Sequence, residues 1–370
     1  MSEARPEANS LSQAEAYACI RLLRSANIGP VSYRQLLARY GTAEAALEAL
    51  PELAARGLKK SYRVATHTKV SAEIEAARAA GARYLFHDSA DYPPLLAELE
   101  SAPPILTARG DAALAHRPAV AMVGARNASA AAVKLARDLA SELAGQGYVV
   151  VSGLARGIDG ACHVGALPAT IGVIASGIDI AYPPQHAKLQ EQIAREGLLL
   201  AEQPPGTEPR GSHFPSRNRI IAGIAAGTLV VEAAPKSGSL ITARLAGEAG
   251  REVMAIPGSP LDARSHGCNQ LIREGAILVQ SAEDVIELLD GFDGKPRSHV
   301  REPEPHFAGE PEDEMPAGAL ADLLSTAPVA VDELIRQTGS SPGAVHMALL
   351  ELEIAGRLAR HAGAKVSLAG

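Results

Sequence analysis

The stretch AVAMVG, residues 119–124, is an apolar run of strand length that no polar side chain interrupts. A continuous run of this kind is typical of a strand buried on both faces, as in a parallel sheet covered by helices. Similar runs follow it, separated by segments of helical length: YVVVSG at 148–153, TIGVIASG at 170–177, LLLAEQ at 198–203, TLVVEA at 228–233, EVMAIPG at 252–258 and AILVQ at 276–280. Because right-handed crossovers join parallel strands, this alternation predicts a doubly wound, Rossmann-like, mostly parallel α/β sheet.

The segments on either side of the sheet have different patterns. Residues 10–80 carry apolar residues at helical spacing around the turn at 27–30, which is typical of a SAM-like or helix-hairpin-helix domain and also of a generic αα-hairpin. We expect residues 84–290 to form the Rossmann-like domain and the acidic, Pro-rich residues 291–317 to be a linker. Residues 318–370 have the pattern of three helices and a hairpin, which predicts a winged helix.

Length and composition exclude several classes of protein. A chain of 370 residues is long enough for two or three domains, and 47% hydrophobic residues exclude wholesale disorder. Aromatic residues make up only 3%, so the core must consist of Ala, Leu, Val and Ile. The sequence has neither an apolar run of membrane-spanning length nor an apolar signal core, and we therefore expect no membrane contact and a cytoplasmic location.

Cysteines and net charge narrow the chemistry further. Cys19, Cys162 and Cys268 are far apart and form no CxxC pair, so a disulfide framework or a zinc site is not expected. Cys162 beside His163 could supply two metal ligands, but a small side chain on a packed helix face is the favoured interpretation. The net charge is −7, so any nucleic-acid binding must come from a local basic patch.

Two strand-to-helix turns carry candidate anion-binding residues. Ligands of α/β sheets bind at the carboxyl ends of the strands, which is where these turns lie. The candidates are Gly124, Arg126 and Ser129 in VGARNAS, and Ser152, Gly153 and Arg156 in SGLARGID. The Arg126 guanidinium suits a phosphate, although a surface ion pair is an equal alternative. Asp159 is interpreted as a helix N-cap, with a catalytic acid as the alternative.

A third cluster combines an aromatic ring with cations. It contains Arg210, Phe214, Arg217, Asn218 and Arg219, and the chain has only four Phe residues. A ring that stacks on a base, beside cations that contact phosphates, is what single-stranded nucleic acid requires. The alternative is a Phe that fills the core while the arginines form ion pairs.

A fourth turn, Ser237, Gly238 and Ser239 with Thr242 one turn later, can cradle a phosphate, and Asn269 lies in a further turn at the same edge. The sequence has no Walker A lysine motif, HExxH motif, GxSxG elbow or carboxylate pair. We therefore expect no catalytic residues, no cofactor and no metal site.

These motifs together resemble the DprA/Smf (DNA processing protein A) family. The resemblance spans about residues 84–290 and rests on VGARNAS, SGLARGID with His163, FPSRNRIIAG, the segment from VVEA to SGSLITA, GREVMAIPG and HGCNQLIREGA. The departures are modest: Cys162 replaces a small Ala, Ala-Glu-Gln at 201–203 replaces the usual Ser-Glu, and Ala follows Ser129 where many members have Gly. A lysine found upstream of the Phe in some relatives is also absent, because Arg210 and Gly211 occupy those positions.

The resemblance implies a non-catalytic protein that binds single-stranded DNA, protects incoming strands in natural transformation and loads the RecA recombinase onto them. It also implies a homodimer formed through the Rossmann-like domain. Arg126, Phe214, Arg217, Asn218 and the turn at 237–239 correspond to the family's pocket residues. The alternative is a Rossmann-fold enzyme that binds a mononucleotide phosphate with the same arginine and Ser-Gly-Ser turn.

The winged helix is not expected to recognise a DNA sequence. Its third helix, from Ser341 to about residue 355, contains no Lys or Arg, and Glu351 and Glu353 would face the phosphates unfavourably. His346 is the remaining candidate contact and is interpreted as a solvated surface residue. We expect a protein-interaction or regulatory role for this domain.

Overall fold

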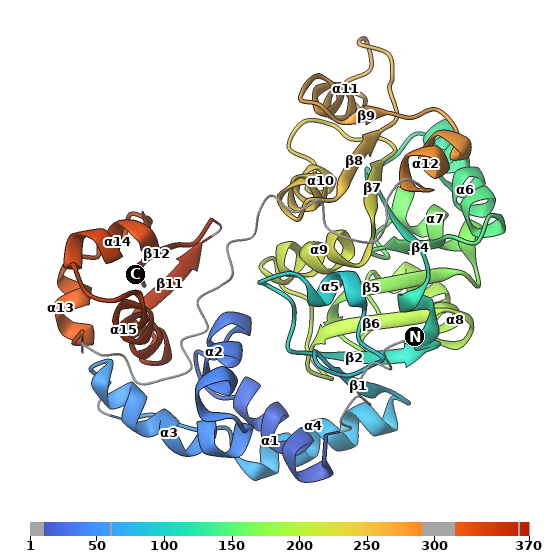
Figure 1. The fold of residues 1–370 in the computed structure, drawn as a ribbon. Helices are drawn as coiled ribbons and strands as arrows, with labels where there is room; N and C mark the ends of the chain where they lie inside the picture. Colours follow the sequence, from blue (N-terminus) through green and yellow to red (C-terminus); the bar gives the residue numbers. More distant parts are fainter. Residues whose placement is uncertain (1–10, 60, 291–314, 362, 370) are drawn as a thin grey trace, which may run out of the picture. The chain divides into compact units, whose positions relative to one another are not determined.

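A computed structural model describes residues 11–59, 61–290, 315–361 and 363–369 (Figure 1). These residues form two compact units, one built from residues 73–290 and one from residues 11–72 and 315–369, and each unit is described by itself. Most of the expected linker, residues 291–314, lies outside the described residues. No described helix is both long enough and apolar enough to cross a membrane.

The first unit, here called the α/β unit, contains a nine-stranded sheet within the described residues, in the order β1-β2-β6-β5-β4-β3-β7-β8-β9. The strands are β1 (Arg83–Phe86), β2 (Ile105–Gly110), β3 (Ala119–Val123), β4 (Val149–Ser152), β5 (Thr170–Gly177), β6 (Leu198–Gln203), β7 (Gly227–Val230), β8 (Glu252–Ala255) and β9 (Ile277–Leu278). Pairing is parallel from β6 to β9, whereas β1 and β2 are antiparallel additions at one edge. The predicted doubly wound, mostly parallel sheet is confirmed.

Helices cover both faces of this sheet because alternate strand residues point to opposite faces. Ala121 packs in a core with α9 and α10, whereas its neighbour Val120 packs in a core with α6, α7 and α12. The helices of the unit are α5 (Pro94–Ala97), α6 (Ala130–Gly145), α7 (Ile158–Ala166), α8 (Ala187–Glu196), α9 (His213–Ile224), α10 (Gly238–Glu248), α11 (His266–Arg273) and α12 (Ala282–Asp290), with 3₁₀ turns η1 (Ala112–His116) and η2 (Pro184–His186). Cys162 is fully buried in the core beside α6, as the packed-helix interpretation expects.

The second unit joins the N-terminal helices to the winged helix. Its helices are α1 (Gln13–Leu23), α2 (Pro30–Tyr40), α3 (Ala43–Arg56), α13 (Ala317–Asp322), α14 (Val331–Thr338) and α15 (Pro342–Ile354), and its strands are β10 (Val329–Ala330), β11 (Leu358–His361) and β12 (Lys365–Leu368). The remaining helix α4 (His67–Ala79) contributes residues to both units. Ser341 is the N-cap of α15 and accepts a hydrogen bond from the Ala344 N–H, as the sequence predicts. The predicted winged helix is confirmed.

Helix α15 is covered by the N-terminal helices of the same unit. One face of α15 belongs to the winged-helix core, but Leu350 and Ile354 are also fully or almost fully buried, outside that core. The Asn27 side chain donates to the Ile354 carbonyl at 3.0 Å. A Cβ added to Gly57 would lie 2.1 Å from the Glu351 carbonyl oxygen, so the two backbones touch. The third helix of the winged helix therefore packs inside its unit.

This packing corrects two expectations about the acidic residues of α15. Glu351 does not face solvent: it is 5% exposed and lies 3.8 Å from a guanidinium nitrogen of Arg56. Glu353 accepts a hydrogen bond at 2.8 Å from Arg360, on the first strand of the wing. His346 is half-buried instead of fully solvated. Charge pattern alone could not show this, because the covering surface comes from the other end of the sequence.

Candidate nucleic-acid interface

The candidate site lies where the strand order of the α/β unit reverses. The chain builds outward from β3 through β4, β5 and β6, and α9 then carries it back across the sheet to β7 on the other side of β3. The carboxyl ends of β3, β4 and β7 are therefore neighbours, and this is where open α/β sheets bind ligands. The predicted turns at 124–129, 152–157 and 237–242 all leave strands that end at this edge.

A cavity of about 200 Å³, here called the rim pocket, opens at this edge. Four of the residues that line it are Arg126 after β3, Arg156 after β4, Tyr182 after β5 and Phe214 on α9. The Arg126 guanidinium lies over the Phe214 ring, 5.3 Å from its centroid. The Tyr182 and Phe214 rings are 5.7 Å apart and inclined by 57°. Two aromatic rings and two exposed cations therefore share one opening.

Tyr182 is a site residue that the sequence analysis missed. It is 40% exposed, although it is a large aromatic residue. Aromatic residues make up only 3% of the chain. The available signal was its place in the turn that follows the apolar run at 170–177, just as Arg126 and Arg156 follow their strands.

Arg217 forms the inner wall of the rim pocket and is not a surface cation. It is 6% exposed, and its Nη1 donates to the Val173 carbonyl at 2.8 Å. Burial lowers the pKa of Arg217 to about 10, and the negative charge of Asp159 opposes that shift. Burial also raises the pKa of Asp159, against the opposing effect of Arg217. The two side chains are therefore buried opposite charges that stabilise each other electrostatically behind the pocket.

The Asp159 carboxylate stabilises the turn after β4, but Asp159 is not the N-cap of α7. The N-cap of α7 is Gly157, at φ 75°, so the N-cap prediction is wrong. The Asp159 carboxylate instead accepts hydrogen bonds from the backbone N–H groups of Gly153 and Ala155, at 3.2 and 3.4 Å. Asp159 lies in the first turn of α7, where a negative charge is favourable.

Gly153 is required because the Arg217 guanidinium lies directly against it. A Cβ at position 153 would lie 1.7 Å from Nη1 and 2.5 Å from Cζ of Arg217. Any side chain here would displace the buried guanidinium. Gly153 was predicted to belong to an anion-binding turn. In the structure it makes room for the buried guanidinium of Arg217.

His163 lies beneath the same turn and is neutral. Its Nδ1 is 2.7 Å from the Thr170 hydroxyl, which itself donates to the Val150 carbonyl, so Nδ1 carries the proton. Burial, together with the neighbouring His186 and Arg217, lowers the pKa of His163 to about 3. The imidazole therefore stays uncharged above that pH in the folded protein.

The structure gives several predicted contact residues internal partners. The Ser129 hydroxyl caps α6 and donates to Glu232 at 2.7 Å, and the Ser152 hydroxyl donates to the Met122 carbonyl at 2.6 Å. Arg219 forms an ion pair with Glu202. Gly124 is packed against Ile158, leaving no room for a Cβ.

The remaining predicted residues lie outside the lining of the rim pocket. Asn218 is buried and donates to the Gly238 carbonyl at 3.4 Å, which connects α9 to the fourth turn. In that turn the Ser237 and Ser239 hydroxyls are 2.8 Å apart, and Thr242 is 1% exposed. Arg210 is exposed, and Asn269 is paired with the backbone of Gly258.

Comparison with known proteins agrees with this architecture. The family model of DNA recombination-mediator protein A matches residues 83–290, a DprA-like N-terminal HHH domain matches residues 13–76, and a DprA winged helix domain matches residues 303–364. Protein Smf of Synechocystis is 38% identical over 318 residues, which cover 76% of this chain and 79% of that protein. DNA processing protein DprA of Streptococcus pneumoniae is 47% identical over 198 residues, or 53% of this chain and 70% of that one.

Two solved structures are similar as well. DprA from Streptococcus pneumoniae superposes with a TM-score of 0.56 at 42% identity, covering 60% of this chain and 77% of that one. DNA processing protein A from Helicobacter pylori, whose structure concerns its single-stranded DNA binding mode, has a TM-score of 0.52 at 31% identity and covers 56% of this chain and 95% of that one.

A Rossmann-like domain with an open basic and aromatic pocket, accompanied by a helical domain and a winged helix, is the architecture of a DNA-processing protein. The chain belongs to the DprA/Smf family of DNA recombination-mediator proteins.

Proposed function

We propose that this chain binds single-stranded DNA at the rim pocket. The observation that carries the proposal is the grouping of Arg126, Tyr182 and Phe214 around one opening, because aromatic rings suit bases and a guanidinium suits a phosphate. Arg156, exposed on the neighbouring turn, adds a second cation at the opening. A solved relative from Helicobacter pylori that is described as binding single-stranded DNA supports the same function.

The rings favour single strands over duplex DNA. Stacking on Tyr182 or Phe214 needs a base face that a duplex keeps inside its own stack. A single strand presents that face without the cost of unpairing. At matched salt we therefore expect higher affinity for a single strand than for a duplex of equal length.

We also propose a wider role for this chain. Relatives are named DNA processing protein DprA. The resemblance to the family implies protection of incoming strands in natural transformation and loading of RecA. We extend this non-catalytic role to the present chain. Its test is the rate at which RecA filaments form on a single strand covered by single-strand binding protein; a rate that this chain does not raise contradicts RecA loading.

Affinity for oligo-dT and for thymidine monophosphate, across a salt series, tests the binding function directly. A polymer binder has higher affinity for the oligonucleotide and a steep salt dependence, because several phosphates release their counterions together. Equal affinity for both ligands with a shallow salt slope would instead favour the mononucleotide-binding enzyme.

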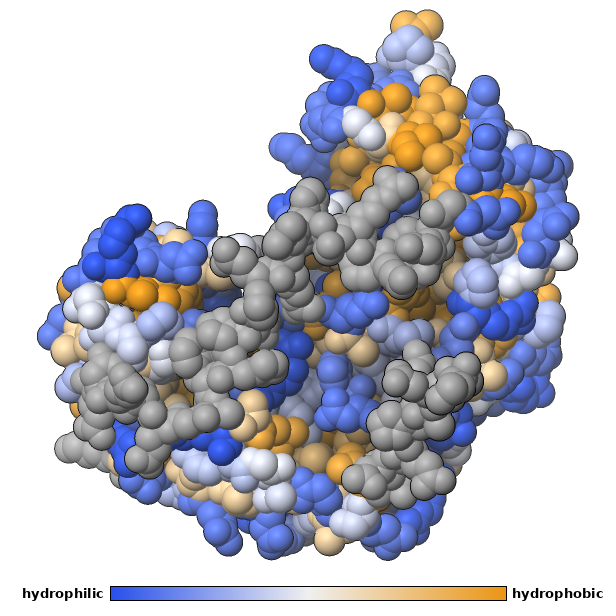
Figure 2. Space-filling model, in the orientation of Figure 1, coloured by the Kyte–Doolittle hydropathy of each residue, from blue (hydrophilic) through white to orange (hydrophobic). Residues whose placement is uncertain are grey.

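An apolar patch at one end of the sheet supports a homodimer formed through the α/β unit. Apolar side chains gather over β8 and β9 (Figure 2), where Leu278 is 46% exposed, and Leu261 on the nearby loop is 95% exposed. We expect Leu278→Lys to convert the dimer to a monomer in light-scattering measurements of molar mass. Leu323→Lys is the matched control, because Leu323 is equally exposed, at 47%, in the winged helix. A Leu278→Lys protein that remains dimeric rules out this interface.

A further inference from the structure

The turn that carries Arg126 is short and exposed at its tip. Strand β3 ends at Val123 and Ser129 is the N-cap of α6, so residues 124–128 join the two elements. Arg126 and Asn127, at the tip, are exposed. An arginine contributes more to binding when the backbone that carries it is already ordered, because less conformational freedom is then lost when the ligand binds. The supports of this turn therefore influence how well Arg126 can bind a phosphate.

Glu232 holds this turn on both sides of Arg126. It lies just beyond β7, and its Oε1 accepts a hydrogen bond from the Ser129 N–H at 3.0 Å. Its Oε2 accepts from the Ser129 hydroxyl at 2.7 Å, and its backbone carbonyl accepts from the Ala125 N–H at 2.7 Å. One residue thus fixes the turn directly before Arg126, at Ala125, and again where the turn enters α6, at Ser129.

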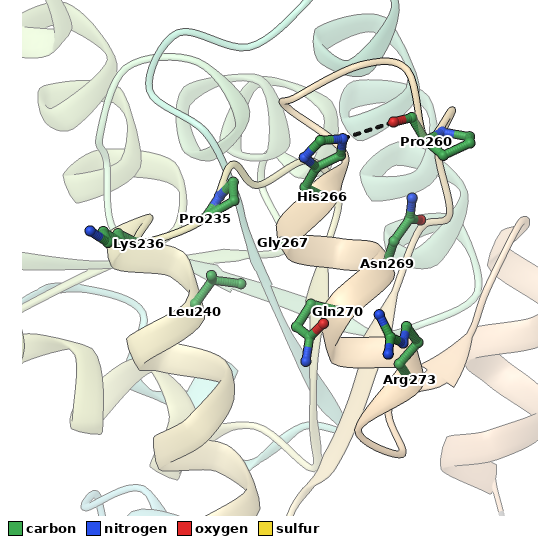
Figure 3. Close-up of a pocket in the computed structure, with 9 residues that line it drawn as sticks. All are labelled: Pro235, Lys236, Leu240, Pro260, His266, Gly267, Asn269, Gln270 and Arg273. Atoms are coloured by element: carbon green, nitrogen blue, oxygen red, sulfur yellow. Dashed lines mark hydrogen bonds between the residues drawn. The ribbon is translucent and has the colours of Figure 1, made fainter.

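Glu232 is itself held in place from another side. It is 7% exposed, and a buried carboxylate is tolerated when its oxygens accept hydrogen bonds, as they do here at the N-terminus of α6. The segment that continues from Glu232 is tied to α11, where the Gly267 N–H donates to the Ala233 carbonyl at 2.8 Å. Figure 3 shows Gly267 on α11 and Pro235 on that segment. The carboxylate is therefore anchored independently of the turn that it holds.

Helix α7 supports the same turn at Ala125. The Ile158 N–H donates to the Ala125 carbonyl at 3.3 Å, and a Cβ added to Gly157 would lie 2.3 Å from that oxygen. The backbone before Arg126 is thus confined by the segment after β7 and by α7. From this fixed turn the Arg126 guanidinium reaches over the Phe214 ring, 5.3 Å from its centroid. Removing one support should therefore shift the guanidinium within the rim pocket.

We propose that Glu232 is a positioning residue for DNA binding, which sets the place of Arg126 in the rim pocket without lining the pocket itself. This inference rests on the proposed function, since it needs Arg126 to contact a phosphate. It reverses the sign that charge alone predicts. A carboxylate near the DNA repels phosphates, so loss of its charge should raise the affinity, whereas loss of its hydrogen bonds should lower the affinity.

Two substitutions in the full chain separate the charge of Glu232 from its hydrogen bonds. Glu232→Gln and Glu232→Ala both remove the negative charge, but only glutamine keeps an oxygen for the Ser129 N–H and an amide that can donate to the Ser129 hydroxyl oxygen. We expect Glu232→Gln to bind oligo-dT at least as tightly as the unaltered chain. Glu232→Ala should bind about fivefold more weakly at 0.1 M salt, because loss of one phosphate contact flattens the single-strand salt slope by about 0.7.

A second comparison shows whether Glu232 acts through Arg126. In an Arg126→Ala background, Glu232→Ala should cause no further loss of affinity, since the residue that it positions is gone. Ser129→Ala removes the hydroxyl contact and keeps the backbone one, so it should give a smaller loss that also disappears in that background; it serves if Glu232→Ala does not fold. Arg244→Ala and Glu248→Ala, which alter an exposed pair on α10 outside the rim pocket, are the controls and should bind like the unaltered chain.

Equal affinities of Glu232→Gln and Glu232→Ala, or a loss that persists in the Arg126→Ala background, overturn the positioning role and leave the proposed function intact. If Arg126→Ala itself binds oligo-dT as tightly as the unaltered chain and with the same salt slope, the proposed function fails instead.

Discussion

Replacing Gly153 by alanine should destabilise the α/β unit severely although it adds a single methyl group. The new Cβ would lie 1.7 Å from Arg217 Nη1, so the guanidinium must leave its position. It would then lose its 2.8 Å hydrogen bond to the Val173 carbonyl and be displaced within the field of the buried Asp159 charge. A hydrogen bond made by a charged group contributes about 1.5–3 kcal/mol. We expect a loss of this size in the free energy of unfolding.

Urea unfolding followed by far-UV circular dichroism measures this loss. Gly145→Ala is the control, because no atom lies within 4 Å of the Cβ that it adds at the end of α6. Arg217→Met supplies the decisive comparison, because it removes the atoms that the new methyl group meets. In that background Gly153→Ala should cost less than about 1 kcal/mol, as expected for coupled neighbours. If the costs of the two substitutions add, or if Gly153→Ala costs little in the unaltered chain, the added methyl group does not act through Arg217.

Two further predictions concern pH and the second unit. Because His163 has a pKa of about 3 when folded and 6.5 as a free side chain, the unfolded chain binds a proton between these values that the folded protein excludes. The free energy of unfolding should therefore fall as the pH is lowered from 6.5 towards 3, by up to about 1.4 kcal/mol per pH unit. A His163→Gln variant whose free energy of unfolding has the same dependence on pH would contradict this. Gly57→Ala should separate α15 from the N-terminal helices, since its Cβ would meet the Glu351 carbonyl. Faster proteolysis within the winged helix should follow. Gly318→Ala should behave as wild type, because its Cβ would make only an ordinary contact, at 3.7 Å, with Leu58.

The sequence predicted the sheet well because buried parallel strands have an unambiguous pattern. Runs such as 148–153 and 170–177 are apolar throughout, and each is followed by a helix-length segment. The winged helix was also predictable, from the Ser341 N-cap and the apolar spacing that follows it. In both cases the signal is local and lies within one element.

The candidate site was only partly predictable because its residues differ in burial, and burial depends on distant parts of the chain. Arg126 and Arg217 look alike in the sequence, yet the first is exposed over a ring and the second is buried and hydrogen-bonded to the Val173 carbonyl. Burial of Glu351 against Arg56 joins residues from opposite ends of the chain, which no local pattern can reveal. Tyr182 was missed because its turn contains no cation to draw attention to it.

Whether the rim pocket holds single-stranded DNA can be measured by the affinity of Phe214→Ala and Arg126→Ala for oligo-dT. Loss of one stacking platform should weaken binding by about 1–3 kcal/mol, and loss of the guanidinium should flatten the salt slope by about one. The Arg244→Ala control should bind like wild type. If both pocket variants bind oligo-dT as tightly as wild type and with the same salt slope, the rim pocket is not where this protein holds DNA.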